Sequence, residues 1–229
     1  MALYAIGDLH LCLSAPKPMD IFGGIWTGYM DKLRKGLSVI TENDTTVLLG
    51  DLSWAMDLKN AKEDFAFIDA IPGRKIILKG NHDYWWSTAA KFYKFCEENK
   101  FSDQFILNNN HYEYENWAVC GTRGWFFEEE KGDAHDAKVM NREIIRLETS
   151  LKSAGSLDKM VFLHYPPRYR GYLCQPILDL LKAYDVKRCF YGHLHGPAQK
   201  LAVEGLWEGT DFRLVAADRL NFKPFTVIS

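Results

Sequence analysis

The sequence predicts an α/β protein built around a parallel β-sheet, and two observations support this. First, short apolar runs end abruptly in polar residues, which is typical of buried strands. These runs cover residues 3–6, 47–49, 76–78, 161–163 and 189–191. Second, helix-like segments at about 29–40 and 61–71 separate the first three runs, and Pro72-Gly73 closes the second segment. Alternating strands and helices indicate β-α-β units, whose strands lie parallel in one sheet.

The rest of the chain adds further elements to this pattern. A third helix is expected at 86–99, and the stretch 105–125 is expected to form a β-hairpin around the Asn-rich turn 108–110. An amphipathic helix is expected at 134–154, entered through the acidic run Glu128-Glu129-Glu130, which is interpreted as a solvated face. Short strands are expected again between Gly196 and the C-terminal sequence FKPFTVIS. The sequence contains no repeat, low-complexity tract or clear linker.

Composition and charge exclude several classes of protein. The apolar, charged, Gly and Pro contents are ordinary for a globular protein, and no apolar run approaches the ~18 residues that a membrane span needs. The formal net charge of −2 gives no electrostatic footprint for broad nucleic-acid binding. The N-terminal sequence MALYAIGDLH has no positively charged start and becomes polar by Asp8, so it does not resemble a signal peptide. A cytoplasmic location is therefore expected.

The five cysteines are odd in number, widely scattered and never spaced as C-x-x-C. This spacing disfavours both a disulfide framework and a thiolate zinc site. The cysteines are therefore interpreted as ordinary buried thiols.

Polar residues follow each of the apolar runs. In open α/β sheets ligands bind beyond the carboxyl ends of the strands, because each strand delivers its following residues to the same edge. The residues delivered there are Asp8 and His10 after the first run, Asp51 after the second, Asn81, His82 and Asp83 after the third, His164 after the fourth, and His193 and His195 after the fifth. They include five of the seven histidines in the chain, which chance placement would scatter.

The residue types in this set indicate a metal site. Taken singly, a strand-end Asp or His is more often a satisfied structural residue than a ligand. In a flat, unbent strand, however, His193 and His195 would point to the same side with Leu194 opposite, and two imidazoles on one side suit a metal. Five strand ends that all supply Asp, Asn or His favour a metal centre over unrelated structural residues.

The ordered set D-x-H, G-D, G-N-H-D, H and G-H-x-H resembles the calcineurin-like metallophosphoesterase superfamily over residues 8–195, and in particular its small bacterial-type phosphohydrolases. The resemblance implies a single domain over residues 1–229, with two packed mixed β-sheets flanked by helices in a four-layer αββα sandwich. It also implies one metal held by Asp8, His10 and His195, and a second held by Asn81, His164 and His193. Asp51 would bridge the two metals.

The chemistry that the resemblance implies is hydrolysis of a phosphate ester, with two divalent or trivalent transition-metal ions, drawn from Mn, Fe, Zn and Ni, as cofactors. Two divalent ions bring four positive charges and the carboxylates of Asp8 and Asp51 remove two, so a phosphate anion can neutralise the surplus. A hydroxide that bridges the metals would attack phosphorus in line. His82 would donate a proton to the leaving-group oxygen, and Asp83 would stabilise its imidazolium.

Other residues near these motifs carry weaker predictions. Many relatives have a further Asp about two residues after the bridging one, where this chain has Ser53, a candidate hydrogen-bond partner for the site. Arg123 and Arg168, with Arg170 nearby, follow expected strand ends and are candidates for binding the substrate phosphate through two parallel hydrogen bonds. The aromatic residues beside the motifs are interpreted chiefly as core, with a stacking rim for a nucleobase as the alternative.

The sequence therefore predicts an enzyme, a metallophosphoesterase acting on a phosphomonoester or phosphodiester, with a nucleotide-like substrate as one option and no membrane partner. The alternatives within enzymes are a small-molecule phosphatase, a cyclic-nucleotide-type phosphodiesterase, a nuclease and a protein phosphatase, and the balanced charge argues mildly against a nuclease. The alternative from another class is a catalytically retired metal-binding scaffold for protein–protein interaction. The presence of every expected ligand and of His82 argues against that scaffold. The sequence does not specify the oligomeric state.

Overall fold

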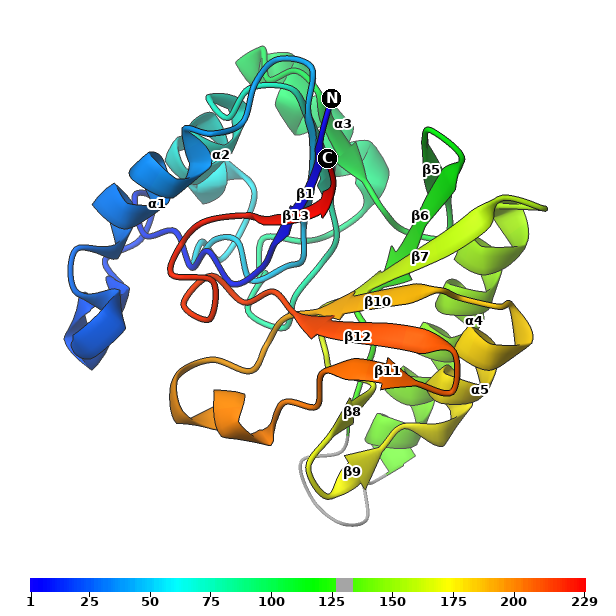
Figure 1. The fold of residues 1–229 in the computed structure, drawn as a ribbon. Coiled ribbons are helices and arrows are strands. Elements are labelled where there is room, and N and C mark those ends of the chain that lie inside the picture. The colour runs from blue at the N-terminus through cyan, green and yellow to red at the C-terminus, as the bar shows by residue number, and fades with distance from the viewer. Residues whose placement is uncertain (127–133) are drawn as a thin grey trace. The chain divides into compact units, whose positions relative to one another are not determined.

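The computed structural model describes residues 1–126 and 134–229, and the chain divides into two compact units. Unit 1 consists of Met1–Ile106 with Val215–Ser229, and unit 2 consists of Leu107–Leu214. Each unit contains a mixed β-sheet and helices (Figure 1), which confirms the prediction of two mixed sheets flanked by helices. The acidic run Glu128-Glu129-Glu130 lies outside the described residues. No helix in the described ranges is long and apolar enough to cross a membrane.

Unit 1 contains a five-stranded sheet in the order β13-β1-β2-β3-β4. Its strands are β1 (Leu3–Ile6), β2 (Thr45–Leu48), β3 (Arg74–Ile77), β4 (Gln104–Ile106) and β13 (Phe225–Ile228). The first four strands run parallel, and β13 pairs antiparallel with β1. The connecting helices are α1 (Tyr29–Leu37), α2 (Lys62–Asp69) and α3 (Ala89–Asn99). The predicted β-α-β units are thus confirmed, and the carboxyl ends of the parallel strands meet at one edge.

One row of aliphatic side chains builds the core of unit 1. Ile6, Leu48, Ile77 and Ile106 are aligned across the four parallel strands, and all belong to the same buried cluster as the inner faces of the three helices. Full burial of each such side chain contributes about 1.5–3 kcal/mol, so the row fixes where each strand ends. Four of the five cysteines are buried, as predicted, whereas Cys12 is partly exposed.

Local sequence features set the ends and the packing of these helices. The Thr88 hydroxyl accepts a hydrogen bond from the Lys91 amide at 3.3 Å, so α3 begins at residue 89, three residues later than predicted. In α1, a Cβ on Gly36 would lie 1.8 Å from the Phe222 carbonyl oxygen. Only glycine therefore allows α1 to pack this closely against the C-terminal segment. Three 3-10 turns, η1 (Met19–Phe22), η2 (Gly24–Trp26) and η3 (Lys59–Ala61), complete the connections.

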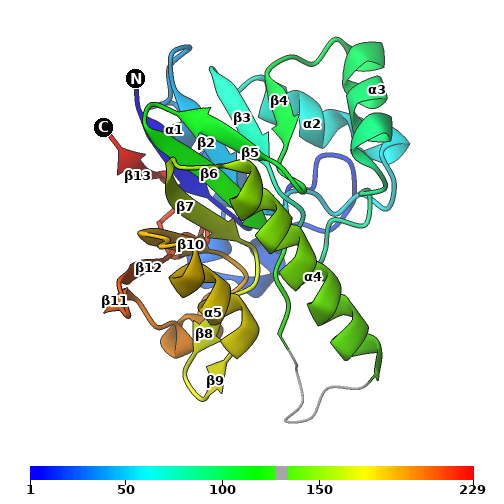
Figure 2. The same cartoon turned by 90° about the vertical axis from the view of Figure 1, so that its right-hand side faces the viewer.

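Unit 2 contains a six-stranded sheet in the order β11-β12-β10-β7-β6-β5. Its strands are β5 (His111–Tyr114), β6 (Trp117–Thr122), β7 (Asp158–Leu163), β10 (Arg188–Tyr191), β11 (Gly205–Trp207) and β12 (Thr210–Leu214). The central strands run parallel, and each edge strand is antiparallel to its neighbour. Helices α4 (Ala134–Ser153) and α5 (Gln175–Ala183) pack against each other beside this sheet (Figure 2). A small hairpin joins β8 (Arg168–Tyr169) to β9 (Tyr172–Leu173).

The predicted hairpin around the Asn-rich turn is wrong. The strands that flank residues 108–110, β4 and β5, belong to different sheets, because the chain passes from unit 1 to unit 2 there. The side-chain oxygen of Asn110 accepts a hydrogen bond from the Asn108 amide at 2.6 Å, which closes a local turn. The actual hairpin joins β5 to β6 through Glu115 and Asn116, with Glu115 at φ 51°.

A buried carboxylate holds the first strands of unit 1 together. One oxygen of Asp44 accepts a hydrogen bond from the Ala2 amide at 2.6 Å, and the other accepts from the amide and the hydroxyl of Thr41, both at 2.8 Å. Burial alone would raise the pKa of the Asp44 carboxyl, but these donors stabilise its charged form and lower the pKa below the ordinary value. The ionised form of Asp44 therefore stabilises the folded chain.

We predict that Asp44→Asn lowers the free energy of unfolding at pH 7 by about 1–3 kcal/mol, because hydrogen bonds to a charged acceptor are lost. A carboxyl with a lowered folded-state pKa stabilises the protein above its unfolded pKa of about 3.9, and loses this effect as the pH falls through its folded pKa. The difference from wild type should therefore shrink below about pH 4. Urea unfolding at several pH values measures it, with the exposed Asp31→Asn as control. An unchanged difference at low pH would contradict this account.

Candidate metal centre

The loops that follow β1 and β2 run side by side in unit 1. The Asp8 amide donates to the Gly50 carbonyl oxygen at 2.9 Å, and the His10 amide donates to the Asp51 carbonyl oxygen at 2.9 Å. The pairing continues one residue further at Leu11. Three of the predicted metal ligands are therefore carried by one hydrogen-bonded pair of backbone segments.

The backbone at several predicted ligands is in the left-handed region. The φ angles are 58° at Asp8, 46° at His10, 51° at Asp51 and 67° at His193. For residues other than glycine this conformation costs on the order of 1–3 kcal/mol each, and it persists only where the surrounding structure enforces it. Because such strain concentrates at functional sites, its presence at four predicted ligands supports their assignment.

The donor atoms of these loops converge within unit 1. A ligand atom of Asp8 lies within 4.8 Å of one of His10, and Nε2 of His10 lies 3.9 Å from Oδ2 of Asp51. All three side chains are buried. The Tyr29 hydroxyl from α1 donates to the His10 carbonyl oxygen at 2.8 Å, which further fixes this residue. Buried carboxylates and an imidazole without a thiolate form a donor set that is compatible with a metal ion, whose identity stays a prediction.

Two glycines allow the loop after β3 to approach this pair. A Cβ on Gly80 would lie 2.1 Å from Oδ1 of Asp51, and a Cβ on Gly50, whose φ is 84°, would lie 2.4 Å from the Gly80 nitrogen. The His82 amide can then donate to Oδ1 of Asp51 at 2.7 Å. The motif G-N-H-D thus begins with glycine because any side chain there would displace Asp51.

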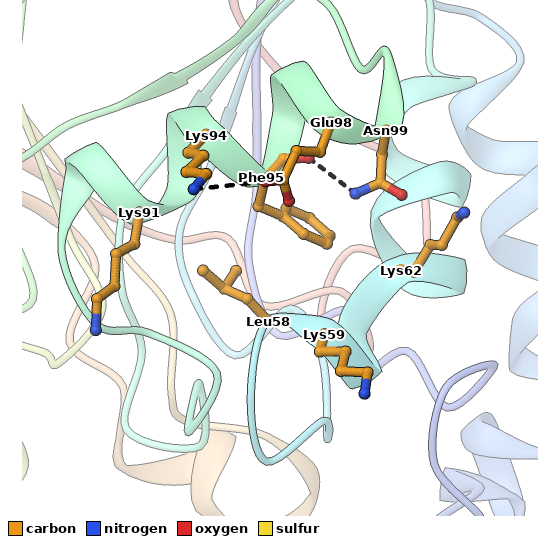
Figure 3. Close-up of a pocket in the computed structure, with 8 residues that line it drawn as sticks. All are labelled: Leu58, Lys59, Lys62, Lys91, Lys94, Phe95, Glu98 and Asn99. Carbon is orange, nitrogen blue, oxygen red and sulfur yellow. Dashed lines mark hydrogen bonds and ion pairs between the residues drawn. The ribbon is translucent and has the colours of Figure 1, made fainter.

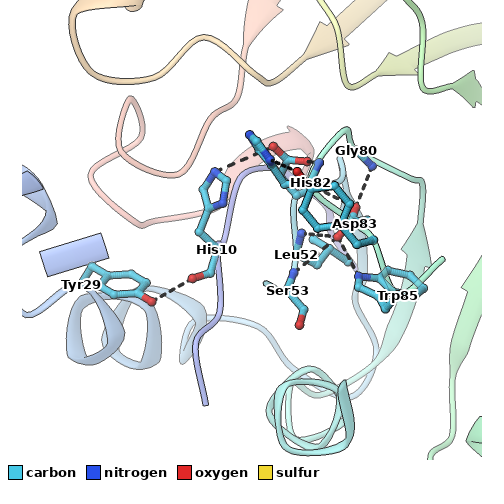
Figure 4. Close-up of polar contacts among 10 residues, drawn as sticks. His10, Tyr29, Leu52, Ser53, Gly80, His82, Asp83 and Trp85 are labelled. Carbon is cyan, nitrogen blue, oxygen red and sulfur yellow. Dashed lines mark hydrogen bonds and ion pairs between the residues drawn. The ribbon is translucent and has the colours of Figure 1, made fainter. Parts of the chain in front are cut away.

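A second buried carboxylate, Asp83, joins the loops that follow β2 and β3 (Figure 4). Its Oδ2 accepts from the amides of Asp51 and Gly80 at 2.8 and 2.7 Å. Its Oδ1 accepts from the Leu52 amide and from the indole Nε1 of Trp85, both at 2.8 Å. Since these donors come from both loops, the Asp83 carboxylate sets the position of Asp51 relative to the loop after β3.

The Asp83 carboxylate bonds to backbone and indole N–H groups. Among the described residues, Asp83 makes no hydrogen bond or ion pair with the His82 ring, because its two oxygens already accept from these N–H groups. Burial raises the pKa of Asp83 to about 6, and the charge of Asp51 adds to this effect, whereas the N–H donors oppose it. Asp83 therefore fixes backbone at the site, and its stabilisation of a His82 imidazolium stays a prediction.

The His82 ring lies half-buried beside two aromatic residues. Its Nδ1 is 3.3 Å from the Tyr84 hydroxyl oxygen, so Nε2 is the nitrogen that can face a substrate. The ring centroid of Trp54 lies 4.8 Å from that of His82, and also 4.8 Å from that of His10, on which it stacks at 23°. Trp54 and Tyr84 thus hold the two imidazoles of unit 1 in place.

The aromatic residues around G-N-H-D divide between core and surface. Trp85 belongs to the buried core, as the main interpretation predicted, whereas the Tyr84 side chain is 48% exposed. Trp54 is half-buried, and the Lys17 ammonium lies 4.6 Å from its ring centroid. The stacking rim therefore stays a prediction, to which Trp54 and Tyr84 are placed to contribute.

Unit 2 brings two further predicted ligands together. The amides of His164 and Tyr165 both donate to the Arg123 carbonyl oxygen, at 3.1 and 2.9 Å, and the Gly192 amide donates to the His164 carbonyl oxygen at 3.1 Å. The ring centroids of His164 and His193 lie 5.2 Å apart, with a ligand atom of each within 4.8 Å of the other. The ends of β7 and β10 thus present a pair of imidazoles.

The H-x-H segment is not an unbent strand, so the alternation considered for it does not apply. Strand β10 ends at Tyr191, and the left-handed φ of 67° at His193 turns the chain. His195 is again extended, is half-buried, and precedes the 3-10 helix η4 (Gly196–Leu201). The turn at His193, and not strand periodicity, determines where the imidazoles of His193 and His195 lie.

The two arginines predicted to bind substrate make contacts inside unit 2. The Arg123 guanidinium lies 3.6 Å from the buried carboxylate of Glu143 and 4.7 Å from the ring centroid of Trp125. The Arg168 guanidinium lies 4.4 Å from the ring centroid of Trp207. These contacts give both side chains a structural role, and their binding of phosphate stays a prediction.

Sequence reasoning missed Asp64, a residue of α2 that hydrogen-bonds to these loops. The Ser53 hydroxyl donates to Oδ2 of Asp64 at 2.5 Å and accepts from the Ala55 amide at 3.0 Å. Within the described residues it makes no hydrogen bond with the Asp51 side chain, so its role as a hydrogen-bond partner for the site stays a prediction. Asp64 belongs to no motif. The signal that could have identified it is an acid on the buried face of α2, beside Phe65 and Ile68.

A pocket of about 410 Å³ on unit 1 lies apart from this chemistry. Figure 3 shows its lining of Leu58, Lys59, Lys62, Lys91, Lys94, Phe95, Glu98 and Asn99, which come from η3, α2, α3 and the residue before η3. The lining contains no histidine and none of the predicted ligands. Among its charged groups, Lys94 and Glu98 form an exposed ion pair at 3.7 Å.

An α/β fold that presents buried carboxylates and imidazoles on strained strand-end loops defines a metal-binding α/β protein. The family model described as calcineurin-like phosphoesterase matches residues 1–197. The chain belongs to this family, which confirms the predicted resemblance. A search of curated protein sequences finds no match.

Several solved structures share the fold at low sequence identity. A protein of unknown function from Aquifex aeolicus, AQ665, is 16% identical with a TM-score of 0.51, covering 98% of this chain and 95% of that one. The phosphopantetheinyl hydrolase PptH from Mycobacterium tuberculosis is 14% identical with a TM-score of 0.57, covering 94% and 88%. The protein TT1561 from Thermus thermophilus is 13% identical with a TM-score of 0.56, covering 99% and 97%.

We predict that Asp83→Asn lowers the free energy of unfolding of the metal-free protein by about 2–4 kcal/mol, because an amide NH₂ would face N–H donors that now share a charged acceptor. Chelator-treated protein unfolded in urea gives the value. Asp57→Asn is the matched control, because Asp57 also accepts from a local amide but is exposed. Equal stabilities for the Asp83 variant and wild type would show that its carboxylate does not hold the loops.

Proposed function

We propose that this protein is a metal-dependent phosphohydrolase that uses two metal ions to cleave a phosphomonoester or phosphodiester. The observation that carries the proposal is the convergence of Asp8, His10 and Asp51 on left-handed, buried loops in a chain of the calcineurin-like phosphoesterase family. Buried charges are costly unless they are paired or bind metals. A cation is the partner that suits this group of donors.

The proposed ligand sets follow the family motifs. Asp8, His10 and His195 would hold one metal, and Asn81, His164 and His193 would hold the other. Asp51 would bridge them. Support comes separately from unit 1, where the carboxylates and His10 converge, and from unit 2, where His164 and His193 do.

The charge of these sets suits an anionic substrate. Metals bound there would supply positive charge to the phosphoryl oxygens and lower the pKa of an attacking water. The protein contributes carboxylates only at Asp8 and Asp51, and Asn81 adds a neutral oxygen. The donor set thus leaves positive charge uncancelled where a phosphate would bind.

His82 is proposed as the proton donor to the leaving group. It adjoins Asn81, its amide is fixed on Asp51 at 2.7 Å, and its half-buried ring lies beside Trp54 and Tyr84. In the imidazolium form, Nδ1–H could donate to the Tyr84 hydroxyl oxygen, and the proton on Nε2 would be the one transferred, which leaves a neutral imidazole. Positioned proton transfer of this kind contributes typically ~10²- to 10⁴-fold to a rate.

The substrate is proposed only as a class, a phosphate ester. The similar structure from Mycobacterium tuberculosis is that of a phosphopantetheinyl hydrolase, so a phosphodiester of an alcohol is a reasonable first compound to test. The exposed Tyr84 and the half-buried Trp54 beside His82 favour esters that carry a flat group. A panel of mono- and diesters, with metal added singly, tests the assignment. A chain that binds metal but turns over no ester would be the retired scaffold.

We predict close to two metals per chain by elemental analysis, and a difference between two ligand variants. Asp51→Asn should reduce binding of both metals, because both would share its carboxylate. His10→Ala should chiefly weaken one. Metal content after dialysis against buffered metal reports both. A single metal at saturation in wild type would rule out the dinuclear centre, and equal mild losses in the two variants would contradict the bridging role of Asp51.

We also predict that His82→Ala keeps its metals but slows turnover by ~10²- to 10⁴-fold on esters with alkoxide leaving groups. Nitrophenolate leaves largely without a proton, so the loss should be smallest on a nitrophenyl ester of the same phosphate class. Comparing kcat on the two esters, with metal content measured in parallel, tests this. Loss of metal would make His82 a ligand, and equal slowing on both esters would indicate charge stabilisation instead of proton donation.

A further inference from the structure

The carboxylate of Asp64 lies fully buried on α2 and bonds to two of the ligand-bearing loops. Its Oδ1 accepts from the amides of Leu13 and Ser14 at 2.9 and 3.2 Å, and its Oδ2 accepts from the Ser53 hydroxyl at 2.5 Å. The Asp64 amide donates in turn to the Ser14 hydroxyl oxygen at 3.1 Å. Four hydrogen bonds therefore join this helix residue to the two loops.

These partners lie just beyond the predicted ligands along the chain. Leu13 follows His10 by three residues, and Ser53 follows Asp51 by two. Between the ligands and the Asp64 contacts, the two loops are paired by backbone hydrogen bonds from His10 to Asp51 and onward. Asp64 thus binds both loops at one end of this short paired segment, and the predicted ligands His10 and Asp51 lie at the other end.

A helix-stabilising role does not account for this arrangement. Asp64 is in the first turn of α2, where negative charge is favourable. An exposed acid there would give the same benefit, and the side chain of Asp64 caps no amide of its own helix among the described residues. Burying a carboxylate fully is costly unless it is well hydrogen-bonded. The bonds that offset this cost all fix the loops after β1 and β2.

We infer that Asp64 is a positioning residue, which holds His10 and Asp51 in the geometry for metal binding through the paired loops. The inference rests on the proposed function, because it takes these two residues as metal ligands. The hydrogen bond between Asp64 and Ser53 fixes the loop that contains Asp51. The hydrogen bonds from the Leu13 and Ser14 amides to Asp64 fix the loop that contains His10. Asp64 itself contacts neither substrate nor metal in this role.

The test compares two carboxylates on the same helix. Asp69, at the other end of α2, accepts from the Ser102 amide at 2.8 Å and from the Gln104 side-chain nitrogen at 3.1 Å. Its side chain therefore ties α2 to the segment around the start of β4 instead of to the loops of His10 and Asp51. Asp69→Asn matches Asp64→Asn in chemistry and in the type of contact that is lost.

Affinity for Mn²⁺ and for Zn²⁺ would be measured on the full chain by competition with a chelator. Asp64→Asn should weaken binding by about 10- to 100-fold, the usual effect of losing a residue that orients a ligand. Asp69→Asn should leave affinity within about twofold of wild type. Ser53→Ala removes one of the hydrogen bonds to Asp64, together with the bond that Ser53 accepts from the Ala55 amide, so it should fold and should weaken binding in the same direction by less. Amide exchange of Leu13 and Ser14 in metal-free protein should accelerate in Asp64→Asn only.

The possible outcomes separate the two hypotheses. Wild type that binds metal, with Asp64→Asn and Ser53→Ala of unchanged affinity, overturns the positioning role and leaves the proposed function intact. Equal weakening by Asp64→Asn and Asp69→Asn also overturns it, since general loss of stability would then explain both. Wild type that binds no metal overturns the proposed function, and the inference with it. If Asp64→Asn does not fold, the Ser53→Ala affinity decides.

Discussion

The position of the predicted ligands in unit 1 depends on buried carboxylates that accept hydrogen bonds from loop backbone. Where a loop leaves a sheet, its N–H groups lose their ladder partners and must find other acceptors. A carboxylate has about four acceptor positions, so one side chain can satisfy several N–H groups and hold them at a fixed separation. Asp83 does this for the loops after β2 and β3. Asp64 does it for the loop after β1, and it also accepts from the Ser53 hydroxyl in the loop after β2.

This network explains how the strained residues persist. Asp8, His10 and Asp51 have left-handed φ angles that an isolated loop would relax. Each is held by backbone pairing, and the contact between Gly50 and Gly80 leaves no space for the loops to shift. The fold therefore places the donor atoms before a metal binds. The entropy lost in ordering these loops is then part of folding and not of metal binding.

Parts of this arrangement follow directly from sequence, and others do not. Apolar runs with polar ends predicted the strands and the polar side chains that follow them, because burial and strand periodicity leave a local pattern. The Asn-rich hairpin was wrong because a local side-chain bond at Asn110 produces the same turn signal as a hairpin. The hydrogen-bond partners of Asp83 and Asp64 were not predictable, because bonds between residues far apart in the chain produce no regular spacing pattern in the sequence. Left-handed φ at His193 is likewise decided by tertiary context.

The loop after β3 shows how one short segment can divide several roles. Asp83 is fully buried and faces backbone donors, while His82 is half-buried and faces aromatic rings. Neighbouring side chains diverge from an irregular backbone, so an anchor and a proton donor can be adjacent without contact. Asp83 accepts a hydrogen bond from the Asp51 amide, and the His82 amide donates to the Asp51 carboxylate. The proposed metal ligand Asp51 and the proposed acid His82 are therefore held by the same loop contacts. These contacts fix the distance between the two residues without a direct bond between their side chains.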